Sequence, residues 1–186
     1  MENARKLLTS LLIVASLGGL AAFGAFSAFS DTTSNSGNSF AAGSVSIGNN
    51  ATTQLYSVSN GKPGTASTNR CIKITYSGSL PATVKVYRGT TSGTLGTYID
   101  LTVTKGTGSQ EDCSDFVAGT AVYNSTLGSF ATDWTGGLAL TNAANSAAWS
   151  NGDAVTYRFS ATIQDNNSAK GLNTGSHAFT WEARNN

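Results

Sequence analysis

The amino-acid sequence predicts an all-β fold, a jelly-roll-type antiparallel β-sandwich that follows a flexible N-terminal arm. From residue 44 onward, apolar and polar residues alternate with a period of two, which is the period of a half-buried strand. Gly, Asn, Ser and Pro separate these stretches and favour turns. Charged residues make up only 11% of the chain, well below the usual quarter of a soluble protein. The surface is therefore expected to be polar but mostly uncharged.

The N-terminus shows the three regions of a secretory signal peptide in their usual order. Arg5 and Lys6 precede an uncharged, mainly apolar stretch over residues 7–26, and the small residues Ser27 and Ala28 follow it. We predict cleavage between Ser27 and Ala28. A retained membrane anchor is the alternative, because about 20 apolar residues can cross a bilayer. Both interpretations place the rest of the chain outside the cytoplasm.

An N-terminal arm over residues 28–43 is predicted to separate the leader, residues 1–27, from a β-sandwich domain over residues 44–186. The arm is rich in Ser, Thr, Asn and Gly and has too few large apolar residues to form a core. It is either a disordered terminus without function or a segment that adds a strand to the sheet of another subunit. The candidate donor-strand residues are Ala28, Phe29, Asp31, Phe40 and Ala41.

Alternating stretches in the body are predicted strands. Within residues 71–76, the odd-numbered side chains face one side, whereas Ile72, Ile74 and Tyr76 face the other. Strands of this kind expose one face to solvent and need an apolar cover for the other, so two sheets are expected to cover each other. The predicted strands span residues 44–47, 53–58, 71–76, 82–88, 98–104, 154–163 and 177–183.

Turns and connections are predicted from Gly and Pro. Residues 61–67 and 76–82 combine Pro with Gly or Ser. These residues favour turns, because Pro fixes φ and Gly supplies positive φ. Between residues 106 and 152 the alternation weakens. A short helix is expected there, around residues 142–148.

The chain contains two cysteines, Cys71 and Cys113. An even number of cysteines in an exported chain indicates a disulfide more often than a metal or redox site. We therefore predict a Cys71–Cys113 bridge. Two buried thiols are the alternative.

Charge and motifs disfavour several functions. Removal of residues 1–27 takes two of 11 basic and one of 10 acidic residues, which leaves nine of each. A neutral chain has no field to attract nucleic acid. His177 is the one histidine, whereas zinc peptidases usually place two on one helix face. No Gly-x-Ser-x-Gly motif accompanies it. The chain is not predicted to be an enzyme, and no cofactor, catalytic residue or metal ligand is assigned.

Two further candidate binding sites have weaker support in the sequence. Glu111, Asp112 and Asp115 surround Cys113 and offer oxygen atoms to calcium, but they lack the spacing of a preformed calcium loop. A solvated turn is the preferred interpretation. The three tryptophans could line a sugar-binding face, although burial in the core is the more common role of such residues. They are Trp134, Trp149 and Trp181.

The leader and arm resemble the N-termini of the TasA/camelysin family, secreted bacterial matrix proteins that a SipW-type signal peptidase processes. The body is similar in its Lys-Pro-Gly turn, in residues 72–87 and in its closing strands at 155–163 and 179–183. This chain departs from the family's pattern at Thr65 and Arg184, and its cysteine pair is unusual. The matching arm positions are Ala28, Phe29, Asp31, Phe40, Ala42 and Gly43.

The resemblance implies a jelly-roll subunit that polymerises in the extracellular matrix or at the cell surface by donor-strand exchange. The arm, freed at Ala28, would fill a sheet edge or groove of the next copy. Its implied partners are other copies of itself, a SipW-type signal peptidase, and other matrix or cell-wall components. Two alternatives stay open. They are a camelysin-like secreted metallopeptidase and a monomeric carbohydrate-binding jelly roll.

Overall fold

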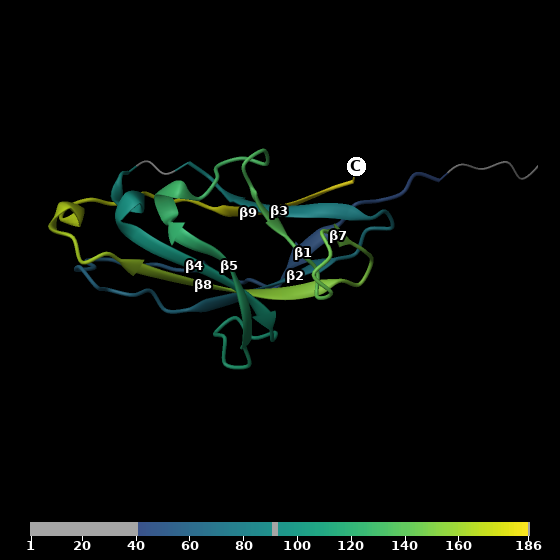
Figure 1. Cartoon of the computed structure of the whole chain (residues 1–186), viewed down its shortest axis with the longest axis horizontal. Helices are drawn as coiled ribbons and strands as arrows, with labels where there is room; N and C mark the ends of the chain where they lie inside the picture. Colours follow the sequence, from purple (N-terminus) through teal and green to yellow (C-terminus); the bar gives the residue numbers. More distant parts are fainter. Residues whose placement is uncertain (1–40, 91–92, 186) are drawn as a thin grey trace, which may run out of the picture. The chain divides into compact units, whose positions relative to one another are not determined.

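The computed structural model describes residues 41–90 and 93–185 (Figure 1). From Ala42 onward these residues belong to one compact unit. The predicted signal peptide, its cleavage site and most of the arm lie outside the described residues, whereas Ala41 is described and exposed. The predicted arm residues outside the described part are Ala28, Phe29, Asp31 and Phe40.

One layer of the fold is a five-stranded antiparallel sheet with the order β1-β2-β8-β4-β5. Its outer strands are the short β1 on one edge and β5 on the other. The strands are β1 (Ile47–Asn49), β2 (Arg70–Tyr76), β8 (Ala154–Ile163), β4 (Ile99–Thr107) and β5 (Val117–Thr126).

The second layer is a four-stranded sheet built around β3. Thr83 of β3 pairs with Arg184 of β9 and also with Ala148 of β7, so β9 and β7 lie on opposite edges of β3. Strand β6 pairs with β3 beside β7. The strands are β3 (Ala82–Arg88), β6 (Leu138–Leu140), β7 (Ala148–Trp149) and β9 (Phe179–Arg184), and the short 3-10 helices are η1 (Leu95–Tyr98), η2 (Leu127–Ser129) and η3 (Asn167–Ala169).

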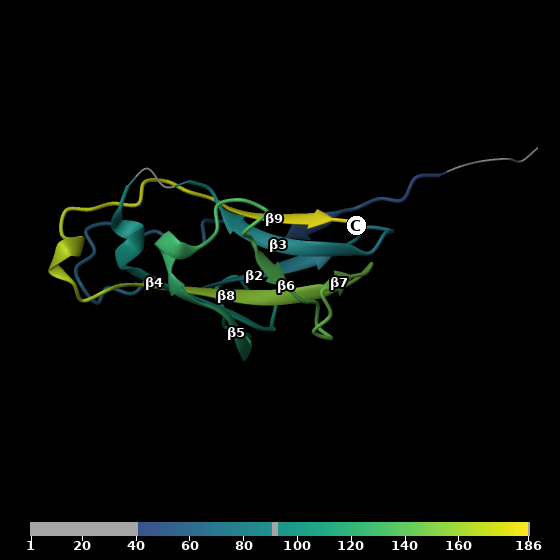
Figure 2. The same cartoon turned by 45° about the horizontal axis from the view of Figure 1, so that its top comes forward.

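The two sheets pack face to face, which confirms the predicted all-β sandwich (Figure 2). Every second side chain of β2, β3 and β8 points inward, as the sequence pattern predicts. Buried aromatic residues satisfy their polar atoms on main-chain carbonyls. The indole of Trp149 donates to Leu140 O at 3.1 Å and the hydroxyl of Tyr157 donates to Thr141 O at 3.0 Å. The core thus gains apolar burial without an unpaired donor at these residues.

The Lys-Pro-Gly turn also forms as predicted. Lys62 O accepts from Thr65 N at 2.9 Å. Gly64 has φ +79°, the left-handed conformation that the third position of a type II turn requires. The turn lets the following residues pair with the end of β8, where Ala66 bridges Thr162.

Two sequence predictions are wrong, and the strand predicted at residues 44–47 overlaps β1 only at Ile47. Residues 53–58 form no strand, because no neighbouring strand pairs with them in the described part of the chain. The expected helix at residues 142–148 is instead a turn, in which Asn145 has φ 63°, a left-handed value that a right-handed helix excludes. The Asn142 side chain stabilises this turn by accepting from Ser146 N at 2.9 Å.

The sequence of β5 lacks a clear alternation of apolar and polar residues, and the structure explains why. Its first five residues are exposed, so no face of this part needs to be apolar. Register shifts in its pairing with β4 interrupt the ladder between Val103 and Gly106. A period-two pattern is therefore absent where a strand is present.

The predicted disulfide is present. Cys71 and Cys113 form a bridge with a Cα–Cα distance of 5.1 Å. Cys71 belongs to the outward-facing set of β2, so the bridge fastens the loop before β5 onto the outer face of the five-stranded sheet. Cys71 N also donates to Glu111 O in this loop at 2.9 Å.

Removal of the bridge is expected to destabilise the domain strongly. The bridge joins residues 42 positions apart, so the chain-entropy model gives a loss of about 4 kcal/mol in the free energy of unfolding for the Cys71→Ala/Cys113→Ala variant. Urea unfolding would measure this loss. The reduced wild type is the matched control and should behave like the variant. An unchanged urea midpoint in both would contradict the prediction.

Candidate functional site

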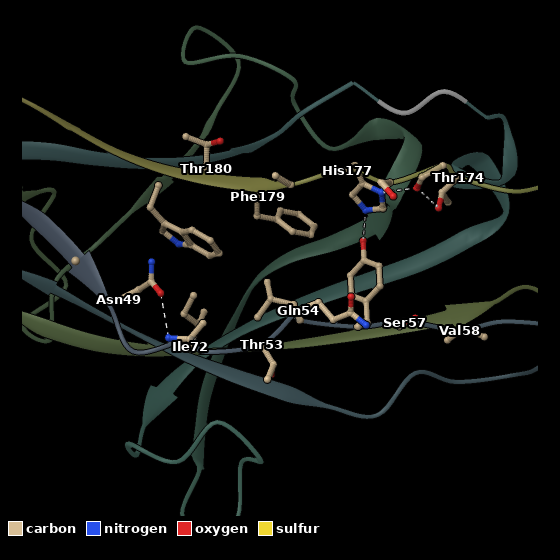
Figure 3. A pocket seen from close by; sticks show the side chains of 18 of the residues that line it. Asn49, Thr53, Gln54, Ser57, Val58, Ile72, Thr174, His177, Phe179 and Thr180 are labelled. Atoms are coloured by element: carbon tan, nitrogen blue, oxygen red, sulfur yellow. Dashed lines mark hydrogen bonds between the residues drawn. The ribbon is translucent and has the colours of Figure 1, made fainter.

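A groove of about 740 Å³ runs along one side of the sandwich (Figure 3). Residues 47–58, which include β1, form one wall, and residues 174–181, which include the start of β9, form the other. Ile72 of β2 also lines it. The groove therefore lies where an outer strand of one sheet faces an outer strand of the other.

The wall at β1 has an open main-chain edge. Ser46 and Asn50, which flank the strand, both form main-chain hydrogen bonds on the β2 side, at 3.0 and 3.3 Å. Alternate residues of an antiparallel pair point their main-chain groups in opposite directions. Ile47 and Asn49 therefore direct their N–H and C=O groups away from β2, and no strand pairs with them there among the described residues.

The wall at β9 is open in the same way. Ala178 O accepts from Gly89 N at 2.7 Å, and the register continues with β3 through the whole of β9. By the same alternation, Phe179 and Trp181 direct their main-chain groups away from β3. In the described residues β9 pairs only with β3. Two open strand edges thus border one groove.

Asparagine side chains fix the chain as it leaves β1. Asn49 Oδ1 accepts from Ala51 N at 3.0 Å. Asn50 Oδ1 accepts from Lys73 N at 2.7 Å, and its Nδ2 donates to Ser109 O at 2.8 Å. These bonds replace the strand ladder, so the chain turns away from β2 and continues as the groove wall.

Glu111 holds the next part of this wall. Thr52 donates to Glu111 Oε1 from its N–H at 2.9 Å and from its hydroxyl at 3.0 Å. These hydrogen bonds lower the pKa of Glu111 below its ordinary value, and the bond from the Thr52 N–H has the largest effect. Since Glu111 lies in the loop that the disulfide fastens, the bridge contributes to the position of the wall.

The other acidic residues of this loop also bind main-chain amides. Asp115 accepts from Ser109 N at 2.8 Å and Gln110 N at 3.0 Å, and Asp112 accepts from Ser114 N at 3.0 Å. The hydrogen bonds from these main-chain N–H groups lower the pKa of the Asp112 and Asp115 carboxyls. Among the described residues, no group of three or more His, Cys, Asp or Glu is placed to hold a metal ion.

An aromatic cluster forms the apolar side of the groove. Phe179 contacts Phe159 and Phe130, with ring centroids 5.0 and 5.4 Å apart. Trp181 packs edge-on against Phe159 at 6.0 Å. Because the cluster continues into the core, the groove presents a rigid apolar surface rather than mobile side chains.

Arg88 supports this cluster from inside the fold, and sequence reasoning did not identify it. Its side chain is only 6% exposed, yet it donates to the carbonyls of Leu127, Gly128 and Gly89 at 2.9, 3.1 and 3.1 Å. A buried guanidinium is tolerable when its donors are satisfied in this way. Arg88 thereby holds η2 against the end of β3, beside the aromatic groups.

Trp181 carries an unsatisfied donor. Its Nε1 is buried and has no hydrogen-bond partner in the described part of the chain. A buried donor without a partner costs about 1–3 kcal/mol. This energy is available to any ligand or segment that brings an acceptor to the indole.

One hydrogen bond crosses the groove from wall to wall (Figure 3). The Tyr56 hydroxyl lies 2.6 Å from His177 Nε2. His177 Nδ1 faces the Gly175 carbonyl at 3.3 Å. A carbonyl can only accept, so Nδ1 carries a proton, and in the uncharged form of the ring Nε2 accepts from the Tyr56 hydroxyl. Burial raises the pKa of Tyr56 well above its ordinary value, despite the nearby Arg88, so the hydroxyl keeps its proton.

The three tryptophans do not share one face. Trp149 is fully buried, as the core interpretation predicts, and Trp181 lines the groove. Trp134 lies close to two cations, with Arg184 at 4.5 Å and Lys85 at 5.1 Å from the ring centroid. This arrangement offers no common sugar-binding platform.

A sequence model of the camelysin metallo-endopeptidase family matches residues 3–124, well over half of the 186 residues. The chain belongs to the camelysin family. This result confirms the resemblance seen in the leader, the arm and the first strands. The comparison with curated proteins gave no match.

The name of the camelysin family implies a catalytic metal, and the described residues do not fit one. The family member described here has a single histidine, and both of its ring nitrogens face protein groups, Tyr56 and Gly175. The carboxylates of the acidic loop accept hydrogen bonds from main-chain amides.

None of the described helices is long and apolar enough to cross a membrane.

The anchoring of the groove wall by Glu111 is expected to depend on pH. Because the folded pKa of Glu111 is lowered from 4.5, its stabilisation is complete above that value and is lost as the pH falls through the folded value. Glu111→Gln should therefore speed amide exchange at residues 51–53 at pH 7, and this effect should shrink by about pH 3.

Hydrogen-exchange mass spectrometry at both pH values, corrected for intrinsic rates, checks this. Asp165→Asn is the control, since Asp165 is an exposed carboxylate outside the groove, and it should leave residues 51–53 unchanged. Equal effects of Glu111→Gln at both pH values would contradict the assignment.

Proposed function

We propose that this camelysin-family chain is a secreted structural subunit that forms filaments in the extracellular matrix or at the cell surface. After cleavage between Ser27 and Ala28, the arm of one copy enters the groove of the next. The observation that carries this proposal is the pair of open strand edges, β1 and β9, on either side of one groove that has an aromatic side.

An extended segment in this groove would gain two kinds of interaction. Its main chain can hydrogen-bond to the outward groups of Ile47 and Asn49 on one side and of Phe179 and Trp181 on the other. Its apolar side chains can pack on the aromatic wall. A carbonyl that reaches Trp181 Nε1 would also satisfy the buried indole donor. Main-chain pairing gives affinity, and the spacing of apolar side chains gives the register.

The arm leaves the body at a fixed point. Ser44 N donates to Ser79 Oγ at 2.8 Å, and Leu80 N donates to Ser44 O at 3.1 Å. The Leu80 side chain lies so close to Gly43 that a Cβ there would clash, which explains the glycine of the family pattern. The arm residues before this anchor, 28–42, can span roughly 50 Å when extended.

A donor arm and an acceptor groove are different surfaces, so their contact is heterologous. Heterologous contacts that do not close into a ring extend into filaments. A SipW-type signal peptidase is the proposed partner that frees the arm, because the arm cannot reach a neighbour while its start is held in a membrane. Other matrix or cell-wall components are further candidate partners.

A metallo-endopeptidase is the second candidate, and the description of the matched family favours it. Hydrolysis of casein by the purified chain that stops on addition of a chelator, and returns with zinc, would support it. Activity that does not respond to chelator would point to a contaminating protease.

Deletion of the arm tests the filament proposal. The mature chain from Ala28 is expected to form filaments in electron microscopy, whereas a chain without residues 28–39 should stay monomeric because it has a groove but no donor. Added in small amounts to the mature chain, the deleted chain should cap growing filaments and shorten them. Equal polymerisation of both chains, or filaments of unchanged length in the mixture, would refute donor-strand assembly.

Trp181→Phe tests the role of the indole donor. The variant keeps an aromatic ring but removes the N–H, so filaments should dissociate at lower urea, by about 1 kcal/mol per subunit contact. The free subunit should lose less stability than the filament, since the lost ring contacts are partly offset by removal of an unsatisfied donor. Trp134→Phe, outside the groove, is the control. A larger loss in the free subunit than in the filament would indicate a purely structural role.

A further inference from the structure

Residues 53–58 line the groove but form no regular structure, although their sequence predicts a strand. This stretch, Thr-Gln-Leu-Tyr-Ser-Val, is named the strap. In the described part of the chain, the main-chain groups of residues 53–60 form no hydrogen bond to protein. Buried main-chain donors and acceptors are almost always paired, whereas most residues of this stretch are exposed and leave these groups to solvent. An unpaired stretch of strand-forming residues therefore has the capacity to pair with another strand.

The strap is attached to the fold mainly through side chains. Leu55 and Tyr56 are half-buried and pack against the core. The Thr53 hydroxyl donates weakly to Glu111 Oε2 at 3.4 Å. Beyond Thr53, the hydrogen bond from Tyr56 to His177 is the one that fixes the strap, among the described residues. Beyond Thr53, the position of the strap therefore depends on a single polar contact and on side-chain packing.

This contact crosses the path of a segment in the groove. Figure 3 shows Thr53, Gln54, Ser57 and Val58 along one wall and His177 on the other, with the hydrogen bond to His177 between the walls. Tyr56 also packs against Phe179, with ring centroids 6.1 Å apart. A chain that lies between β1 and β9 meets this bridge before it reaches the end of the groove.

We propose that the Tyr56–His177 hydrogen bond is a latch that keeps the strap closed in the free subunit. Entry of a second copy's arm breaks the latch, and residues 53–58 then pair with the arm as a strand that continues the edge begun by β1. This proposal rests on the proposed filament function, and it names the residues that regulate it.

The strap sequence suits both states. It has no charged residue and no Pro, so neither repulsion nor a missing N–H prevents pairing. Its exposed residues, Thr53, Gln54, Ser57 and Val58, are compatible with the surface of the free subunit. The latch supplies the barrier that keeps this stretch from pairing with other strands before an arm arrives.

Removal of the latch is expected to speed assembly. Tyr56→Phe keeps the ring and deletes the hydroxyl, so the mature chain should polymerise about five- to tenfold faster, the factor that one hydrogen bond provides. His177→Phe should do the same, and the double variant should be no faster than either single variant, because both remove one interaction. Tyr123→Phe is the matched control, since it removes a tyrosine hydroxyl bond, to Thr126 O at 2.7 Å, outside the groove.

Hydrogen exchange provides a second measurement that a general loss of stability would not reproduce. In the unassembled mature chain, Tyr56→Phe should speed exchange at residues 53–58 while the strands β2, β4 and β8 keep their protection. In wild-type filaments the amides of residues 53–58 should become protected.

The outcomes separate the two proposals. Filaments that form at the same rate for wild type, Tyr56→Phe and Tyr123→Phe would overturn the latch and leave donor-strand assembly intact. Filaments in which residues 53–58 exchange as fast as in the free subunit would overturn the strap as an acceptor strand. If the wild type forms no filaments, or if the arm-deleted chain assembles equally well, the filament function fails and the latch fails with it.

Discussion

The sandwich is open along one side because each sheet ends there in a strand with a single described neighbour. The outward main-chain groups of β1 and β9 need hydrogen-bond partners, and no described residue supplies them at the groove. Sheet edges of this kind are usually shielded by charge, proline or a covering element. Here the shield is modest, since β1 is three residues long and the strap covers part of the groove without pairing. Both the proposed filament contact and the latch depend on this incomplete closure.

The groove also depends on distant parts of the chain. The disulfide holds the loop that contains Glu111, and Glu111 holds Thr52 at the start of the strap. On the opposite wall, Arg88 and η2 fix the aromatic cluster that includes Phe179. One wall is thus positioned by hydrogen bonds to the Glu111 carboxylate, and the other by the hydrogen bonds of Arg88 and by aromatic packing. Loss of the loop would therefore loosen the wall at β1 while leaving the aromatic wall in place.

The sequence predicted the elements that bury a regular face and missed those that do not. Alternation identified β2, β3, β4, β8 and β9, because each packs one side against the core. It failed at β5, whose first half is exposed on both faces, and at the turn that contains Asn145, whose left-handed conformation leaves little trace in a single sequence. The disulfide was predictable from cysteine count. Arg88 and the Tyr56–His177 bond were not, because both depend on which segments the fold brings together.

The strap shows why a wrong secondary-structure prediction can still carry information. Residues 53–58 have the β-propensity of a strand, and propensity reports how well side chains suit a pleated, half-buried surface. The described residues of the free subunit offer the strap no partner strand, so tertiary context overrides that preference. In the proposed filament the missing partner comes from another copy, and local preference and structure then agree. A neutral body with nine basic and nine acidic residues after residue 27 would add no long-range repulsion between such copies. The strand prediction then describes the assembled state, and the latch explains why the free subunit departs from it.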